Sequence, residues 1–275
     1  MEFVAKNRVV TATLLTVIFS ILYYQAQKTL FYEGFQMDDE KVTLFVINLD
    51  KDKDRYAKLL KHYMKSDFSK HQKLHRYPAI VGKQEDPKKW LSSDAYNELL
   101  LIEKNGYRTH HHSITRGGLG CFLSHYYLAK KLVQDKTVDS YLILEDDTTL
   151  FPTTYKKITK AMEQIPDDWD MALFYTIRAV GKRENEQFNR LKSFWGLNCY
   201  MLNKRGAEKL VKEVEETKID GQIDSYLSRM IQQNKFHVYA SQKHLVMPNS
   251  SETNIQARLK PHPQMDPYDF KGYKI

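Results

Sequence analysis

Between residues 42 and 240 the chain alternates two kinds of sequence run. Some runs are rich in β-branched and aromatic residues, which is typical of strands, and others place apolar residues at helical spacing. Strand-like runs occupy residues 42–50, 75–82, 141–144, 168–175, 194–203 and 235–240, and helix-like runs occupy residues 51–66, 87–104, 121–134, 204–216 and 220–233. This alternation predicts an α/β fold in which helices flank a mostly parallel sheet. Ligands bind beyond the carboxyl ends of the strands in such sheets, so polar residues there are the first candidates for a site.

The length and charge of the chain are those of a globular protein. Its 275 residues, with 42% hydrophobic and 28% charged residues, are enough for one large globular domain. The formal net charge is +8, but the basic residues are spread among acidic ones rather than gathered in one block. Because no nucleic-acid-binding module is recognisable, we expect no nucleic-acid partner.

The N-terminal segment predicts a membrane anchor. Residues 9–24, "VVTATLLTVIFSILYY", carry no charge and follow Lys6 and Arg8. Counted to Ala26, the run reaches the lower limit of roughly 17–25 residues for a spanning helix. The positive flank predicts a single-pass type II protein with its large domain on the lumenal or non-cytoplasmic side. The predicted parts are a cytoplasmic tail (1–8), a transmembrane signal anchor (9–26), a stem (27–41) and a catalytic domain (42–275). A cleaved signal peptide and a buried core helix are open alternatives.

Three acidic residues end the strand-like run "YLIL". Glu145, Asp146 and Asp147 repel one another, and a hard cation such as Mn²⁺ or Mg²⁺ would offset that repulsion. Side chains two residues apart along a strand point to the same side, so Glu145 and Asp147 are the predicted metal ligands and Asp146 points elsewhere. The alternative is a solvated turn in which Asp147 or Thr148 caps the next helix.

Six segments in order resemble a known family. They are "VINLDKDKDR", "GGLGCFLSHYYLAKKL", "YLILEDD", "WGLNCYMLNKRGAEKL", "IDSYL" and "PNSSETNIQ". Together they are similar to glycosyltransferase family 25, the lipooligosaccharide and procollagen galactosyltransferases. The resemblance implies a GT-A-like, Rossmann-like fold and inverting transfer from a UDP-hexose, commonly UDP-galactose, with Mn²⁺ (or Mg²⁺). The acceptor would be a glycan, glycoprotein or lipooligosaccharide.

The resemblance also implies roles for individual residues. Asn48, Asp50 and Arg55 match the first nucleotide-binding strand, and "EDD" stands where the family has its metal-binding DxD-type motif. Asp224, in "IDSYL", is the candidate base that takes a proton from the acceptor hydroxyl, although an ordinary exposed helix residue is nearly as good an interpretation.

Four further residues complete the predicted donor site: Gly118, His125, Asp146 and Gln256. Gly118 follows Arg116-Gly117 where the family has Pro-Gly, which weakens its assignment as a donor contact. His125 lies on an apolar helix stripe, so a hydrogen-bonded core histidine is the competing interpretation. Gln256 lies in a polar loop that could close over the donor.

Other patterns leave alternatives open. A catalytically inactive family member that binds glycans is one, and a two-metal nuclease or phosphatase using Asp50, Glu145 and Asp147 is another. A Ser124–His125 dyad is unlikely because adjacent helix residues do not face each other. Cys121 and Cys199 could be free or bonded to each other.

Overall fold

The computed structural model describes residues 41–249, except 109 and 111, together with Ser20, Met37 and the backbone of 260–261. Contacts divide the chain into two units, Met1–Gln36 and Met37–Ile275, and every strand and helix below belongs to the second. The anchor predicted over residues 9–26 lies outside the described part apart from Ser20, and so does most of the predicted stem. Among the described residues, no helix combines the length and apolar character that crossing a membrane requires.

The second unit is built on one eight-stranded sheet with the order β2-β1-β4-β9-β6-β10-β8-β7. The strands of this sheet are β1 (Val42–Asn48), β2 (Leu74–Pro78), β4 (Ser140–Glu145), β6 (Met171–Leu173), β7 (Arg178–Arg183), β8 (Phe188–Trp195), β9 (Cys199–Asn203) and β10 (Val238–Ser241). All of these point the same way except β8 and β9, which run in the opposite direction. Most strands therefore share one direction, as predicted, but the sheet is mixed, because β9 is inserted antiparallel between β4 and β6 and β8 between β10 and β7.

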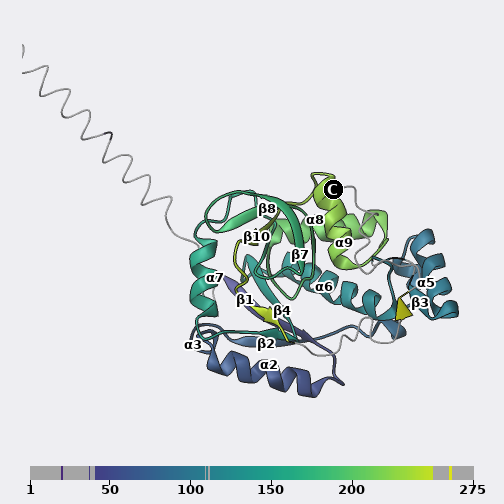
Figure 1. Ribbon diagram of the computed structural model, residues 1–275, viewed down its shortest axis with the longest axis horizontal. Coiled ribbons are helices and arrows are strands. Elements are labelled where there is room, and N and C mark those ends of the chain that lie inside the picture. The colour runs from purple at the N-terminus through teal and green to yellow at the C-terminus, as the bar shows by residue number, and fades with distance from the viewer. Residues whose placement is uncertain are drawn as a thin grey trace, which may run out of the picture. The chain divides into compact units, whose positions relative to one another are not determined.

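Two small ribbons and nine helical segments complete the described fold. The ribbons pair β11 (Met247–Pro248) with β5 (Thr148–Thr149), and β12 (Lys260–Pro261) with β3 (Tyr107–Arg108). The helical segments are α2 (Lys53–Lys65), α3 (Phe68–His71), η1 (Gly82–Gln84), α4 (Pro87–Trp90), α5 (Ser93–Asn105), α6 (Arg116–Gln134), α7 (Thr154–Met162), α8 (Lys204–Thr217) and α9 (Ile223–Gln232). Figure 1 shows α6, α8 and α9 grouped beside the sheet, and α2 and α3 near the β2 edge.

The central strands β1, β4, β6 and β9 are buried on both faces, as their sequences require. In β1, Phe45 and Ile47 join the large apolar cluster that includes residues of α5, α6, α8 and α9. Leu44 and Val46 are buried too but lie outside that cluster, because alternate residues of a strand point to opposite faces. Near-continuous apolar strands of this kind are typical of sheets covered by helices on both sides.

One hairpin was not predicted, and two predicted helix starts are wrong. The hairpin β7–β8 was not predicted, since β7 reads "RAVGKR" and is almost wholly exposed. Helix α6 begins at Arg116 rather than 121, because Thr115 caps it by accepting a hydrogen bond from Gly118 N at 2.9 Å. The helix predicted over residues 220–233 begins only at Ile223, and Asp220, which precedes it, pairs with Arg229.

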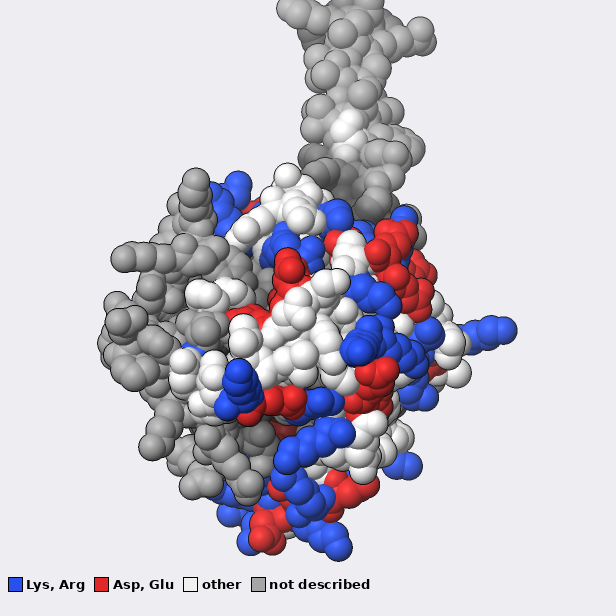
Figure 2. Space-filling view, turned by 90° about the vertical axis from the view of Figure 1, so that its right-hand side faces the viewer, with Lys and Arg blue, Asp and Glu red and all other residues white. Residues whose placement is uncertain are grey.

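The described surface carries charges of both signs. Figure 2 shows Lys and Arg side chains interleaved with Asp and Glu side chains over the face it presents. This mixture agrees with the scattered charge of the sequence and gives no single basic tract on that face.

Candidate active site

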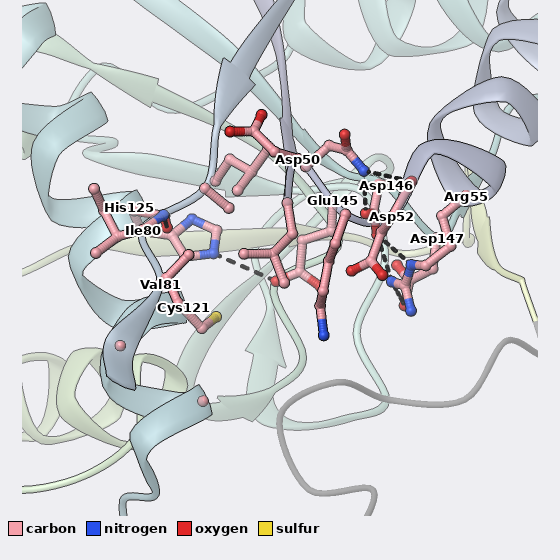
Figure 3. Close-up of a pocket in the computed structure, with 18 of the residues that line it drawn as sticks. Asp50, Asp52, Arg55, Ile80, Val81, Cys121, His125, Glu145, Asp146 and Asp147 are labelled. Atoms are coloured by element: carbon pink, nitrogen blue, oxygen red, sulfur yellow. Dashed lines mark hydrogen bonds and ion pairs between the residues drawn. The ribbon is translucent and has the colours of Figure 1, made fainter. Parts of the chain in front are cut away.

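A pocket of about 630 Å³ opens at the carboxyl ends of β1 and β4. The loop that follows β2 and the N-terminal half of α6 form its other walls. Figure 3 shows side chains from these segments facing one another across it. The position is the one expected for a ligand site in a mostly parallel sheet.

The acidic triplet divides between two directions. The Asn198 side-chain nitrogen donates to Asp147 Oδ1 at 2.8 Å and lies 3.4 Å from Glu145 Oε2. Asp146 turns away and accepts a hydrogen bond from Asn48 Nδ2 at 2.7 Å. The predicted arrangement, with Glu145 and Asp147 on one side and Asp146 on the other, is the one observed.

Asp146 is a buried structural carboxylate. Besides the bond from Asn48, Asp146 accepts a hydrogen bond from Arg55 Nε at 2.7 Å and forms an ion pair with the same guanidinium. Burial raises the pKa of Asp146, while the hydrogen bonds and charge of Arg55 oppose that rise. Asn48 and Arg55 are thus held beside the pocket by contacts within the protein. Figure 3 shows Arg55 next to Asp146 and Asp147.

The surroundings of Asp147 disfavour ionisation of its carboxyl group. Burial and the neighbouring charge of Glu145 raise the pKa of Asp147 to about 6, although Asn198 and Arg55 lower it. The alternative of a solvated turn is wrong, because Asp146 is only 7% exposed and Thr153, not Asp147 or Thr148, is the residue that precedes helix α7. The triplet therefore keeps like charges close together with little solvent to screen them.

His125 is both a buried histidine and a pocket residue. Its Nδ1 lies 2.7 Å from Tyr200 Oη and its Nε2 lies 3.3 Å from Glu145 Oε1. An ionised Glu145 can only accept, so Nε2 carries the proton in that contact and Nδ1 accepts from the Tyr200 hydroxyl. Ser124 makes no dyad with His125, since its hydroxyl donates to Gly120 O at 2.7 Å and accepts from Ile80 N at 2.8 Å.

Asp224 lies in the first turn of α9, close enough to the triplet for the charge of Glu145 to affect its pKa. Its carboxylate accepts hydrogen bonds from Gly196 N at 3.1 Å and Ser225 N at 2.8 Å. Burial raises the pKa of Asp224, and the charge of Glu145 raises it further. A carboxylate with a raised pKa is better matched to accepting a proton near neutral pH than an ordinary exposed one.

The structure does not bring every predicted donor residue into the pocket. Asp50 reaches its mouth, but its side chain is 82% exposed and pairs with Arg76 at 2.5 Å. Gly118 is buried inside α6, and its neighbour Gly117 lines the pocket instead. Gln256 lies outside the described residues.

Residues 247–249 lie close to the triplet. Strand β11 pairs with β5, directly after the triplet, and Asn249 N donates to the Asp147 carbonyl oxygen at 2.5 Å. Lys58 Nζ donates to the Asn249 side chain at 2.5 Å. The motif "PNSSETNIQ" therefore begins at the pocket rim.

Three residues of the site were missed by sequence reasoning: Asn198, Tyr200 and Arg76. Asn198 and Tyr200 lie in the apolar run "GLNCYML". The asparagine within this run is the feature that could have indicated a site residue. Arg76 donates to Asn48 Oδ1 at 2.9 Å from the neighbouring strand. The two cysteines are both free.

These features define an α/β protein with an acidic strand-end pocket and a nearby carboxylate suited to accept a proton. The chain belongs to glycosyltransferase family 25, because the family's sequence model, described as glycosyltransferase family 25 (LPS biosynthesis protein), matches residues 41–227. This match confirms the family resemblance seen in the ordered motifs.

Individual relatives match part of the chain. Procollagen galactosyltransferase 2 of Homo sapiens is 28% identical over 180 residues, which cover 61% of this chain and 27% of the human protein. Procollagen galactosyltransferase 1 of Danio rerio is 26% identical over 210 residues, covering 72% of this chain and 33% of the fish protein. The matches thus span a third or less of these relatives. The glycosyltransferase GlyE of Streptococcus pneumoniae TIGR4 matches with a TM-score of 0.40 and 12% identity, covering 73% of this chain and 45% of GlyE.

Proposed function

We propose that this chain is a metal-dependent inverting glycosyltransferase that moves a hexose, galactose by analogy with its named relatives, from a UDP-sugar to a hydroxyl group. The acceptor class is a glycan, glycoprotein or lipooligosaccharide. The observation that carries the proposal is the shared contact of Asn198 with Glu145 and Asp147, which turns two carboxylates toward the same side of a strand-end pocket.

The donor atoms fit a hard divalent cation. Glu145 and Asp147 offer oxygen ligands, and the charge of Glu145 disfavours ionisation of Asp147, as the raised pKa of Asp147 indicates. Mn²⁺ or Mg²⁺ held by these two carboxylates would supply positive charge to the diphosphate of the donor. Asp146 is not proposed as a ligand, because Asn48 and Arg55 occupy its oxygens.

Asp224 is the proposed base. In the inverting reaction its carboxylate accepts the proton of the acceptor hydroxyl as that oxygen bonds the anomeric carbon. The bond from that carbon to the UDP oxygen breaks, and UDP leaves with the electron pair. The backbone N–H groups of Gly196 and Ser225 hold the carboxylate in place for this proton transfer.

The test is a screen of UDP-sugar donors, followed by measurement of kcat for one variant at each of two aspartates. The wild-type chain is expected to turn over one UDP-sugar only with Mn²⁺ or Mg²⁺ present. Asp224→Asn should lower kcat by at least about 100-fold, with little change in donor affinity. Asp220→Asn is the matched control, since Asp220 lies on the same segment and pairs with Arg229.

Two outcomes would count against this proposal. Binding of glycans without turnover of any donor by the wild-type chain would favour a glycan-binding module instead. Equal kcat values for Asp224→Asn and the wild type would remove Asp224 as the base.

The membrane anchor over residues 9–26 is part of the same proposal. Its support is the uncharged run and the preceding Lys6 and Arg8. The full chain should stay in the membrane pellet after an alkaline wash, and release into the supernatant would contradict a spanning anchor.

A further inference from the structure

Three side chains of different chemistry come close together in the pocket. The Cys121 sulfur, a ring nitrogen of His125 and a carboxylate oxygen of Glu145 all lie within 4.8 Å of one another. Cys121 and His125 are four residues apart on α6, so their side chains lie on one face of the helix. Figure 3 shows both on the same side of the pocket, facing Glu145.

The spacing between His125 and Glu145 fits a shared ion. His125 Nε2 and Glu145 Oε1 are 3.3 Å apart, which is longer than the usual N–H···O distance of about 2.9–3.0 Å. Two ligand atoms bonded to a tetrahedral zinc ion at about 2.0–2.2 Å are separated by roughly 3.3–3.5 Å. The pair is therefore already at the separation that zinc coordination requires.

We propose that Cys121 Sγ, His125 Nε2 and Glu145 Oε1 form a binding site for Zn²⁺ or a similar borderline transition-metal ion. This site is different from the all-oxygen pair of Glu145 and Asp147. A thiolate and an imidazole favour zinc over Mg²⁺ or Mn²⁺, which prefer oxygen ligands. Three protein ligands leave a fourth position for water or a pocket ligand.

The surroundings of His125 support its role as a ligand. Tyr200 Oη, 2.7 Å from Nδ1, fixes the orientation of the buried ring. On metal binding the Nε2 lone pair forms the bond to the ion, and the imidazole proton sits on Nδ1 and is donated to Tyr200 Oη. Cys121 gives up its thiol proton to solvent as the sulfur bonds the ion.

Sharing of Glu145 gives the site a consequence for activity. An ion held by Cys121 and His125 withdraws Glu145 from its partnership with Asp147. Zinc should therefore inhibit the transfer reaction in competition with Mn²⁺. This consequence rests on the proposed function, whereas zinc binding itself does not.

Cobalt gives a direct readout of the sulfur ligand. Titration of the reduced full-length chain with Co²⁺ should produce a near-ultraviolet thiolate-to-cobalt charge-transfer band that excess Zn²⁺ abolishes. Cys121→Ser should lose the band, and Cys199→Ala, at the buried second cysteine, should keep it. Asp147→Asn should also keep it, because Asp147 is not among the three ligands.

The absence of a thiolate band in the wild type, or its persistence in Cys121→Ser, would overturn the proposal. Circular dichroism checks that each variant is folded, and Cys121→Ala replaces Cys121→Ser if the serine variant is not.

A second readout tests the competition. Zn²⁺ should release bound Mn²⁺ from the wild type, seen as a rise in the electron paramagnetic resonance signal of free Mn²⁺. The zinc concentration that halves each variant's own activity should rise more than about tenfold in Cys121→Ser. If no transferase activity is found, the cobalt spectrum still decides whether the zinc site exists. If activity is found and zinc inhibits both proteins equally, the shared-ligand mechanism is wrong.

Discussion

Asn198 binds both sides of the acidic triplet through two different groups. Its side-chain amide donates to Asp147 Oδ1 at 2.8 Å, while its carbonyl oxygen accepts from Glu145 N and from Thr148 Oγ1, each at 2.8 Å. Asn198 directly precedes β9, the antiparallel strand beside β4. The position of the proposed metal ligands is therefore set by a strand that lies about 50 residues further along the chain.

Removal of the Asn198 amide should weaken metal binding. In Asn198→Ala the two carboxylates lose their shared donor, and the pKa of Asp147 should rise above about 6 because the Asn198 hydrogen bond lowers it. We expect Mn²⁺ affinity, measured by calorimetry, to fall roughly 10–100-fold. Asn189→Ala on β8 is the matched control outside the pocket, and an unchanged affinity in Asn198→Ala would exclude the organising role of this residue.

Asp147 should make the metal-free protein less stable as the pH rises. Because the folded-state pKa of about 6 is above the ordinary value of 3.8, the folded protein holds more protons than the unfolded chain between these two values. The free energy of unfolding therefore falls as pH rises through that window, and the loss is complete above about pH 6. Asp147→Asn lacks this contribution and should be more stable than the wild type at pH 7.5 by up to roughly 2–3 kcal/mol.

Urea denaturation at pH 4 and pH 7.5, with chelator present, measures this difference. Added Mn²⁺ should stabilise the wild type more than Asp147→Asn, which reverses the order of the two proteins. If the variant were less stable than the wild type at pH 7.5 without metal, the raised pKa of Asp147 would be contradicted.

The Arg55–Asp146 pair should stabilise the fold as well as the pocket. Arg55→Met leaves the Asp146 carboxylate, which is 9% exposed, with the side chain of Asn48 still donating to it. We expect a loss of about 2–4 kcal/mol in the free energy of unfolding at pH 7.5, and a smaller loss at pH 4.5, where Asp146 can be protonated. The measurement is urea denaturation at the two pH values.

Two further variants sharpen this prediction. Arg55→Met combined with Asp146→Asn should recover most of the stability, because the buried charge of Asp146 is removed together with its partner. Arg190→Met breaks a more exposed pair with Asp168 and should cost at most about 1 kcal/mol. Similar losses for Arg55→Met and Arg190→Met would show that burial of Asp146 adds nothing.

Gly120 should be intolerant of any side chain. A Cβ atom there would lie 2.4 Å from Ile80 O and 2.6 Å from Gly82 N, both backbone atoms of the loop that lines the pocket. Glycine to alanine inside a helix normally gains about 0.5–1 kcal/mol. For Gly120→Ala we expect the opposite sign, a loss of about 1–3 kcal/mol, measured by thermal or urea unfolding. A stabilised variant would mean that α6 and the loop are not in close contact.

Much of the fold and part of the site could be predicted from the sequence. The apolar run "YLIL" before three carboxylates indicated a buried strand ending in a polar site, and the two-residue period of a strand separated Asp146 from Glu145 and Asp147. These features depend on residues next to one another in the chain. Hairpin β7–β8 was not predictable in the same way, because β7 is exposed and basic and so lacks an apolar pattern.

The α/β class, the acidic strand end and the family could be predicted from the sequence alone, because each depends on local periodicity or on an ordered set of motifs. The partners of the site residues come from the packing of the fold: Asn198 donates to the two carboxylates, Arg55 pairs with Asp146, and Cys121 and His125 face Glu145. These pairs come from strands and helices distant in the sequence. Local pattern fixes which side of its own strand or helix a residue faces, whereas the packing of separate elements fixes what it meets there.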